Sequence, residues 1–259
     1  MAERLKLLLA GESLMTTATH IKGWDQFDSA TYHRGADDFV AAMKQVGIDI
    51  AYMPNHEAAS EFPLEAAGLD AYAAILLSDI GSNTLLLPPQ VWIESKPAPN
   101  RLKLIRDYVA RGGGLVMIGG YYSFQGINGG ARYHRSPIED VLPVTMHPFD
   151  DRIEVPEGFT AAVDAEQRGH PILAGVPLEG WPVLLGVNEV KPKPGAAVLA
   201  RLPDSEGAHP LLVAGTHGKG RAVAWTSDIG PHWLPREFSA WVGFAPLWSN
   251  LLRWVSGAR

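Results

Sequence analysis

The chain of 259 residues contains no cysteine. Without a thiol it can form neither a disulfide nor a thiolate metal site, and no cysteine can serve as a nucleophile. It also lacks an excess of positive charge, since 22 lysines and arginines stand against 28 aspartates and glutamates. A general nucleic-acid binder needs a basic surface for the phosphates, so no nucleic-acid partner is expected.

Long hydrophobic runs and nucleotide-binding motifs are missing as well. No apolar stretch reaches the roughly 18 residues that a membrane-spanning helix needs, so no membrane partner is expected. The short apolar run within residues 1–13 predicts the first strand of a cytoplasmic protein rather than a secretory signal. Neither G-x-x-x-x-G-K-[ST] nor a G-x-G-x-x-G after the first strand occurs, so no cofactor is expected, and no metal ligands are assigned.

What the chain does contain is a glycine-framed strand at residues 112–126, GGGLVMIGGYYSFQG. Three glycines end a preceding helix, because glycine adopts positive φ without a steric cost. The apolar run at residues 115–118 is typical of a central strand of a parallel sheet. Gly119 and Gly120 predict a tight exit, and a strand, a tight turn and a helix together resemble a nucleophile elbow.

Strand-like and helix-like segments alternate through the N-terminal half. The expected strands are residues 5–10, 49–53, 73–77 and 115–118, and the expected helices are residues 35–46 and 97–111, the latter with Asn100 as N-cap. This alternation predicts a flavodoxin-like, doubly wound, mostly parallel α/β sheet. Short apolar pieces after residue 144 predict antiparallel additions, followed by a C-terminal helix. A single domain spanning residues 1–259 is expected, because no linker is evident.

Residues 15–34 are polar and aromatic and are expected to form an ordered loop. About twenty residues is long for a connection in a compact domain, and such loops are often functional. Because it follows the first strand, this loop should begin at the carboxyl edge of the sheet and cover a crevice there with His20, Lys22 or Trp24.

Several segments resemble known proteins. The glycine-framed strand resembles class I glutamine amidotransferase-like domains, and GTHGKGRAVAWTSDIGPHW is similar to the closing segment of trehalose-utilisation (ThuA-like) proteins. With LLLAGES, ILLSDIGSNTLLL, ARYHRSPIEDVLPV and DDRIEVPEG, these motifs are similar to an uncharacterised bacterial family of glutamine amidotransferase-like proteins. The resemblance covers nearly the whole chain and implies the class I glutamine amidotransferase-like fold.

The chain differs from true amidotransferases in its catalytic residues. Those enzymes carry a nucleophilic cysteine at the elbow and a His-x-Glu pair after a late strand. Here the elbow falls at about Gly120 and Tyr121, and the late strand ends at Ser227 and Asp228, with His232 further on. The resemblance therefore implies the fold without the glutaminase activity.

Polar side chains follow the expected strands, and strand ends of this fold converge on one crevice. We assign acid–base or orienting roles to Asp79, Asp228 and His232, because a carboxylate beside an imidazole can move protons or hold a metal. Tyr121 and Ser123 stand where the nucleophile would be, although the sequence has no G-x-S-x-G motif. The candidate ligand-binding residues are Glu12, Ser13, Ser78, Gly120, Arg132 and Trp233.

Each candidate also has a structural explanation. Aspartates such as Asp79 and Asp228 commonly cap turns, and serines such as Ser78 satisfy loop amides. Arg132 could hold an anion, but a structural ion pair explains such an arginine equally well. Trp233 could stack on a sugar, although most of the eight tryptophans are expected in the core.

Two functions are consistent with these patterns. The first is a member of the family without glutaminase activity that binds a small polar ligand, of carbohydrate type by analogy with the ThuA-like proteins, and acts by acid–base chemistry. The second is a non-catalytic binding or assembly protein that keeps only the fold. A homo-oligomer is compatible with either function.

Overall fold

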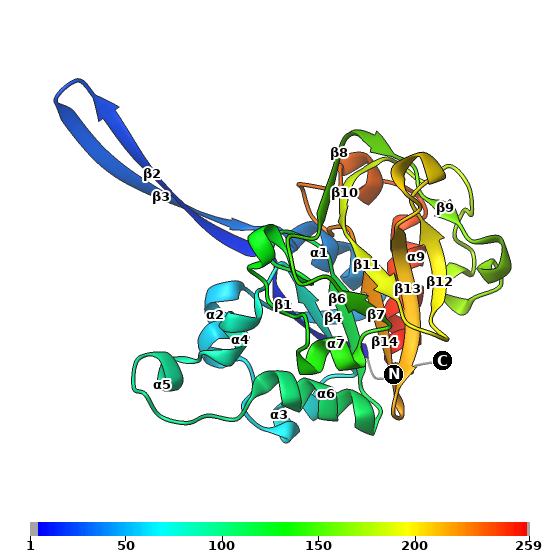
Figure 1. Cartoon of the computed structure of the whole chain (residues 1–259), viewed down its shortest axis with the longest axis horizontal. Helices are drawn as coiled ribbons and strands as arrows, with labels where there is room; N and C mark the ends of the chain where they lie inside the picture. The colour runs from blue at the N-terminus through cyan, green and yellow to red at the C-terminus, as the bar shows by residue number, and fades with distance from the viewer. Residues whose placement is uncertain (1–4, 258–259) are drawn as a thin grey trace.

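The computed structural model describes residues 5–257 and is built on an eight-stranded sheet (Figure 1). The strands, in spatial order, are β4 (Ile48–Met53), β1 (Leu5–Gly11), β5 (Ala74–Ser78), β6 (Gly114–Ile118), β14 (Gly220–Trp225), β13 (Pro210–His217), β12 (Ala197–Arg201) and β9 (Ala162–Val163). The first five pair in parallel, and the pairs from β14 outward are antiparallel. The predicted fold is thus confirmed, and the parallel half has the 2-1-3-4-5 strand order of flavodoxin-like sheets.

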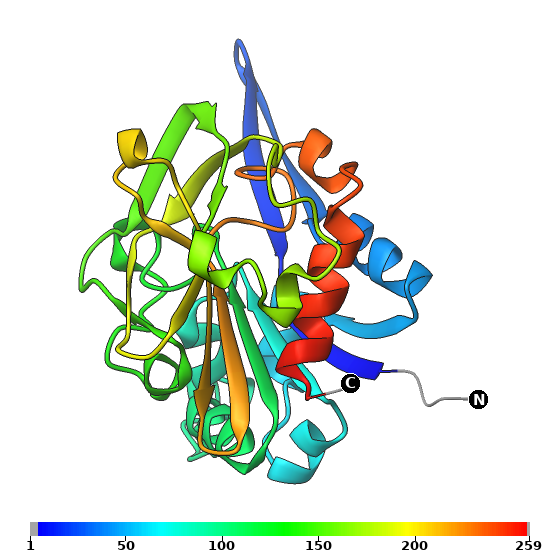
Figure 2. The same ribbon diagram turned by 90° about the vertical axis from the view of Figure 1, so that its right-hand side faces the viewer.

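Helices cover both faces of this sheet, because its central strands are apolar on both sides (Figures 1 and 2). Side chains of β1 alternate between two buried clusters: Leu7 and Leu9 face one, and Leu8 and Ala10 the other. The first cluster includes side chains of α1 (Asp37–Gln45), α8 (Arg236–Ser239) and α9 (Phe244–Val255). The second includes those of α2 (Asn55–Glu61), α3 (Ala66–Asp70), α4 (Ser82–Leu86), α6 (Arg101–Arg111) and α7 (Pro137–Val141). No helix within residues 5–257 combines the length and apolar character that a membrane crossing requires.

Helix α6 begins and ends as the sequence predicts. The side-chain oxygen of Asn100 accepts a hydrogen bond from the backbone N–H of Lys103 at 3.1 Å, which makes Asn100 the N-cap. Gly112 stops the helix with φ of 128°, a conformation that suits glycine alone. Strand β6 follows directly and lies at the centre of the sheet.

Two small sheets flank the carboxyl edge of the main sheet. One pairs β8 (Arg152–Phe159) with β10 (Leu184–Asn188), and the other pairs β7 (Val144–Met146) with β11 (Val190–Pro192). Strand β10 ends at Asn188, whose side chain contacts the turn after β6. The first small sheet therefore supports the edge at which polar residues were predicted to gather.

The predicted loop at residues 15–34 is wrong, because the segment forms a β-hairpin. Strands β2 (Ser13–Lys22) and β3 (Asp25–Arg34) pair along their full length and extend away from the body (Figure 1). Threonine-rich strands joined by the two residues Gly23 and Trp24 explain the hairpin, since β-branched residues favour strands and a short glycine-containing connection favours reversal. Trp24 lies fully exposed at the far tip, so it does not cover a crevice of its own chain.

The predicted helix after the glycine pair is also absent. Residues 119–126 form successive turns, and the next helical element is a 3₁₀ turn at Ile127–Gly129. The carboxylate of Asp151 accepts the backbone N–H groups of Gln125 and Gly126, each at 2.8 Å. These bonds hold the chain in a loop, so the strand exit is tight but is not a complete nucleophile elbow.

Candidate functional site

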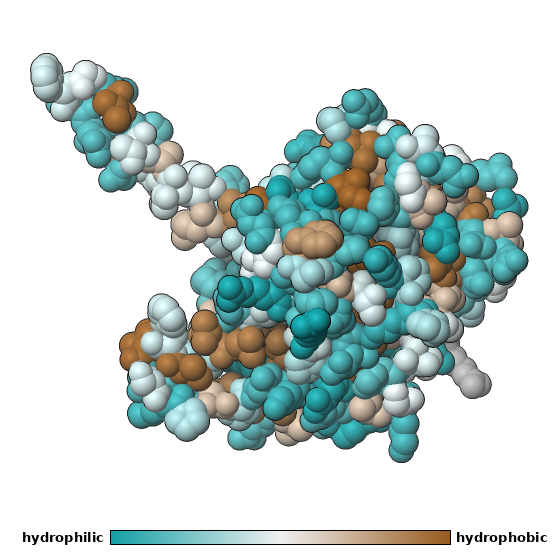
Figure 3. All heavy atoms as spheres, viewed as in Figure 1, coloured by the Kyte–Doolittle hydropathy of each residue, from teal (hydrophilic) through white to brown (hydrophobic). Residues whose placement is uncertain are grey.

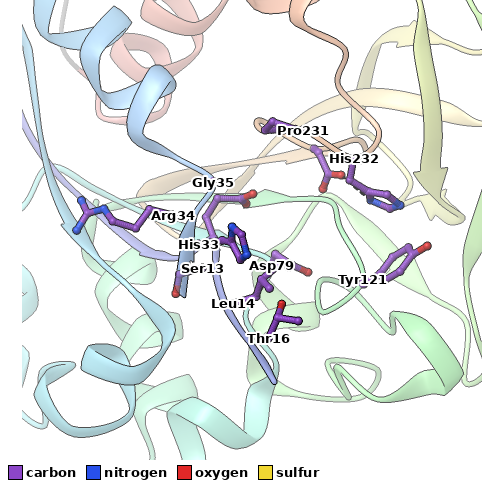
Figure 4. Close-up of a pocket in the computed structure, with 12 residues that line it drawn as sticks. Ser13, Leu14, Thr16, His33, Arg34, Gly35, Asp79, Tyr121, Pro231 and His232 are labelled. Carbon is purple, nitrogen blue, oxygen red and sulfur yellow. Dashed lines mark hydrogen bonds and ion pairs between the residues drawn. The ribbon is translucent and has the colours of Figure 1, made fainter. Parts of the chain in front are cut away.

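A cavity of about 560 Å³ lies at the carboxyl edge of the parallel strands (Figure 4). In this strand order, ligands bind where β1 and β5 diverge, because the connections leaving these two strands run to opposite faces. Glu12 follows β1 and Asp79 follows β5, so both stand at that point. The lining residues are Glu12, Ser13, Leu14, Thr16, His33, Arg34, Gly35, Asp79, Tyr121, Asp228, Pro231 and His232.

Glu12 and Asp79 both have a left-handed backbone, with φ of 48° and 44°. This conformation is unfavourable for residues with a side chain, so surrounding contacts must hold it. The Glu12 N–H donates to the carbonyl of Ser78 at 2.7 Å, and the Asp79 N–H donates to Ser123 Oγ at 3.0 Å. Two strained strand exits side by side aim two carboxyl groups at one place, and strain of this kind is often found at functional sites.

Gly120 lies between two of the carboxyl groups. A Cβ atom at this position would stand 2.8 Å from Asp228 Oδ1 and 2.9 Å from Asp79 Oδ1, and the backbone φ is 133°. Asn188 fixes the turn, because its side chain accepts the Gly120 N–H at 3.0 Å and donates to the Gly120 carbonyl at 3.2 Å. Only glycine therefore fits the space that the two aspartates leave.

The three carboxyl groups of the cavity hold their protons more strongly than free side chains do. Burial, and then the charges of Asp228 and Asp79, raise the pKa of Glu12 well above its usual range, despite the hydrogen bond from Ser78 Oγ at 2.5 Å. Burial raises the pKa of Asp79 to about 6, and it also raises the pKa of Asp228. The cavity can therefore both donate and accept protons close to neutral pH.

Asp228 and His232 form a hydrogen-bonded pair. His232 Nδ1 lies 3.0 Å from Asp228 Oδ2, and the same oxygen accepts the backbone N–H of Trp233 at 3.0 Å. Burial lowers the pKa of His232, but the hydrogen bond and the charge of Asp228 outweigh this effect and raise it overall. The aspartate orients the imidazole through Nδ1, which leaves Nε2 as the nitrogen that can exchange a proton with a ligand.

Tyr121 forms an aromatic wall beside this pair. Its ring centroid lies 4.3 Å from that of His232, and the guanidinium of Arg152 lies 4.8 Å from the same ring. In Figure 4 the rings of Tyr121 and His232 lie on one side of Asp79, and His33 lies on the other. Burial and the charge of Glu154 raise the pKa of Tyr121, so its hydroxyl stays protonated and suits orientation rather than nucleophilic attack.

Several predicted residues support the cavity without lining it. Ser123 is 1% exposed and its Oγ accepts the N–H of Asp79, and Ser78 donates to Glu12. Trp233 is also 1% exposed, and its indole N–H donates to Glu154 rather than facing the opening. Gly120 lies against the carboxyl groups of Asp79 and Asp228. Arg132 is exposed and stands outside the lining.

The structure adds cavity residues that the sequence did not point to. Leu14, Thr16, His33 and Arg34 come from the base of the hairpin, and the pairing of Leu14 with His33 brings its two strands to the cavity together. They were missed because the hairpin was taken for a loop. The threonine-rich strands around a two-residue connection were the signal that could have revealed it.

A metal centre of the usual kind is not formed by the described side chains. Within residues 5–257, no group of three or more histidine, aspartate or glutamate residues is arranged to hold a metal ion. The acidic groups of the cavity are instead bonded to Ser78, to backbone N–H groups and to His232.

Comparison with known proteins points to one family. The family described as "Putative glutamine amidotransferase" matches residues 6–257. Two solved structures of cytoplasmic proteins from Salmonella typhimurium, one of them from strain LT2, are 39% and 42% identical to the chain. Each has a TM-score of 0.90 and covers 97% of this chain and 99% of its own.

More distant similarity concerns the fold alone. A ThuA-like protein from Bacteroides uniformis has a TM-score of 0.61 at 15% identity, over 98% of this chain and 92% of its own. None of the curated proteins compared with the chain matches it.

Proposed function

The chain belongs to the putative glutamine amidotransferase family and shares its fold with ThuA-like proteins, and from this premise we propose a function without glutaminase activity. The protein binds a small, hydroxyl-rich ligand in the cavity at the carboxyl edge and moves a proton on it. The observation that carries the proposal is the convergence of Glu12, Asp79 and the Asp228–His232 pair on one cavity. Each comes from a different strand end, and two of them have strained backbones.

Neither side chain predicted at the nucleophile position, Ser123 or Tyr121, suits a covalent mechanism. The chain has no thiol, and Ser123 is buried with its Oγ occupied by the N–H of Asp79. Tyr121 stays protonated because its pKa is raised. Proton transfer remains, since burial raises the pKa of Asp79 to about 6 and the hydrogen bond and charge of Asp228 raise the pKa of the His232 imidazole.

A hydroxyl-rich ligand suits the chemistry of the walls. Carboxyl groups with raised pKa values can donate to or accept from a hydroxyl group, and the Tyr121 ring offers a flat apolar face of the kind on which sugars stack. The volume of about 560 Å³ lies within the usual range of small-molecule sites. A ligand with its own carboxylate is disfavoured above about pH 6, where Asp79 is ionised.

The two Salmonella relatives are described as cytoplasmic. Their similarity over nearly the whole chain supports the same compartment for this protein. A cytoplasmic ligand of low molecular weight is consistent with a cavity of this size.

The test is a thermal-shift screen with neutral monosaccharides, disaccharides and polyols, and with simple carboxylic acids as the contrasting set. Neutral hydroxylated compounds should raise the melting temperature, because a ligand that binds only the native state stabilises it by mass action, by about 2.7 kcal/mol at a hundred times Kd. Asp79→Asn and His232→Gln should abolish these shifts while leaving the protein folded. Asp204→Asn, at an exposed position in the 3₁₀ turn Asp204–Glu206, is the matched control and should keep them.

Two results would contradict the proposal. One is stabilisation by carboxylic acids only, because an acidic cavity should reject them. The other is stabilisation by sugars that survives both Asp79→Asn and His232→Gln, because the binding would then lie elsewhere.

A non-catalytic assembly function is the second candidate, and a specific observation favours it. The β2–β3 hairpin projects from the body with large apolar side chains exposed along it. Such a surface is typical of a protein–protein contact rather than of an enzyme surface open to water. The two functions are compatible in one molecule.

A further inference from the structure

The hairpin at residues 14–34, called the arm below, is exposed at every one of its 21 positions. Large apolar side chains are exposed at its base and near its tip, and Figure 3 shows hydrophobic residues on the arm. These exposed side chains are Leu14, Met15, Ile21, Trp24, Phe27 and Tyr32. Trp24 at the tip contacts nothing that would shield it.

An arm of this kind is poorly stable on its own. A two-stranded hairpin in water is marginal at best, and both edges of this one are without a neighbouring strand. Within the arm, Thr19 Oγ1 donates to Asp28 Oδ1 at 2.7 Å, and the His20 and Phe27 rings stack at 4.6 Å. These contacts link the two strands but leave the apolar side chains open to water.

We propose that the arm is a dimerisation element that crosses the arm of a second copy of this chain. The two arms lie antiparallel about a twofold axis that passes at Ala18 and Ser29, which are paired across the hairpin. Each arm stacks on the other through the face that carries Ala18 and Ser29. Because side chains alternate along a strand, Leu14, Thr16 and His33 of the cavity wall share this face.

The distribution of side-chain size along the arm fits a crossing at this point. Small residues occupy the middle, where two arms must approach closely, and bulky residues occupy the base and the tip. On the face that carries Ala18 and Ser29, these small residues also include Thr16 and Thr31. A twofold axis at the middle brings the base of one arm to the tip of the other, as a self-complementary isologous contact requires.

Charge and size also favour a second copy. The arm carries Lys22, Arg34, Asp25 and Asp28, a balanced set, whereas the whole chain has a formal charge of −6. Two arms can therefore meet without the repulsion that two bodies would feel. Ten side chains of each arm lie on the stacking face, a number that fits a small protein–protein contact.

The crossing would also complete the cavity. Trp24 lies five residues before Ser29 and Arg34 lies five residues after it, so the axis sets Trp24 of one copy opposite Arg34 of the other. His33, which precedes Arg34 and lies on the stacking face, lines the cavity, and the indole of the second copy would therefore stand at its mouth. This last step rests on the proposed function of the cavity, whereas dimerisation does not.

The lack of cysteine makes the crossing directly testable. Ala18→Cys places the only thiol of the chain at the proposed axis, and mild oxidation should join two copies into a covalent dimer in high yield. Ser205→Cys, an exposed position in the turn Asp204–Glu206, is the matched control and should remain largely uncross-linked. Equal cross-linking of both variants would overturn the proposal.

Sedimentation of the full chain tests the dimer without any cross-link. We expect a dimer at micromolar concentrations, and Trp24→Ser with Phe27→Ser should weaken it by at least about tenfold, since apolar anchors dominate such contacts and Phe27 shares the face of Ala18 and Ser29. Trp92→Ser, which removes an exposed tryptophan of α5 (Pro89–Trp92), should leave it unchanged. A monomeric full chain would overturn the proposal, as would an arm protected from hydrogen exchange only when anionic lipid vesicles are added.

The same variants test dimerisation and ligand binding separately. If Trp24→Ser with Phe27→Ser dissociates the dimer, the arm assignment stands whatever the sugar screen gives. If it also removes the sugar-induced thermal shift while Asp204→Asn keeps it, Trp24 contributes to the ligand site. A dimer unchanged by the arm variants would overturn the crossing even with the sugar shifts intact.

Discussion

Asp79 fits both explanations that the sequence allowed for it. Its Oδ1 accepts the backbone N–H of Tyr122 at 2.6 Å, which is the turn-capping role of an ordinary aspartate. The same side chain lines the cavity, and its backbone is left-handed. A turn cap alone needs neither burial nor strain, so the combination at one residue favours a role beyond the cap.

The raised pKa of Asp79 predicts how stability depends on pH. Burial raises this pKa from 3.8 to about 6, so the native state holds the proton longer than the unfolded chain does. The free energy of unfolding should therefore fall as the pH rises from about 4 to about 6, by up to about 3 kcal/mol, and stay low above that. Asp79→Asn should make this fall smaller, measured by urea unfolding across the window, and the remaining fall comes from Glu12 and Asp228, whose pKa values burial also raises.

A control separates Asp79 from the other titrating groups. The pKa of His232 is raised, so its contribution to stability is lost only at higher pH, and the pKa of Asp150 is lowered, so it acts at lower pH. Asp204→Asn should keep the fall seen in the unchanged chain. If Asp79→Asn shows the same fall as the unchanged chain, the buried-acid interpretation of Asp79 is wrong.

At the scale of elements, the sequence predicted the features that depend on residues close together in the chain. Helix α6 was predicted because Asn100 and Gly112 mark its ends, and the polar strand exits were predicted because parallel strands share an edge. The arm was missed because neither of its faces is buried. Without burial no alternation of apolar and polar residues develops, and periodicity is the main strand signal.

The distances within the cavity could not be predicted from sequence. Gly120 was assigned to a tight exit, but its place between Asp79 and Asp228 depends on how β5, β6 and β14 are staggered. Likewise Asn188, which fixes this turn, comes from a small sheet distant in sequence. Contacts between separate elements can be seen only in the folded structure, whereas the residue types at each strand end can be identified in the sequence.

Gly119 provides a prediction at the same scale. A Cβ atom there would lie 2.2 Å from the carbonyl oxygen of Thr226, at the end of the neighbouring β14. Gly119→Ala should therefore push two central strand ends apart and lower the free energy of unfolding by about 1–3 kcal/mol or more. Gly169→Ala, where a Cβ would meet nothing within 4 Å, should change it little. Similar midpoints for both variants in urea unfolding would show that the strand exit is loose.

At the scale of the whole molecule, the parallel strands and the arm contribute different walls of the same cavity. The five parallel strands bring Glu12, Asp79, Tyr121 and Asp228 to one edge. The arm adds its base to the wall of the same cavity. The cavity and the arm are therefore joined through the few residues that belong to both.

The composition of the whole chain also bears on glutamine hydrolysis, the reaction of true amidotransferases. Glutamine hydrolysis in this fold needs a thiolate at the strand exit, and no cysteine exists anywhere in the 259 residues. Gly120 and Tyr121 stand at that exit, and Tyr121 keeps its proton because its pKa is raised. Purified protein incubated with glutamine should therefore release ammonia at the rate of the protein-free blank, with an active glutaminase as the positive control. Ammonia release that rises in proportion to protein concentration and disappears in His232→Gln would show that this cavity hydrolyses glutamine by a route without a thiol.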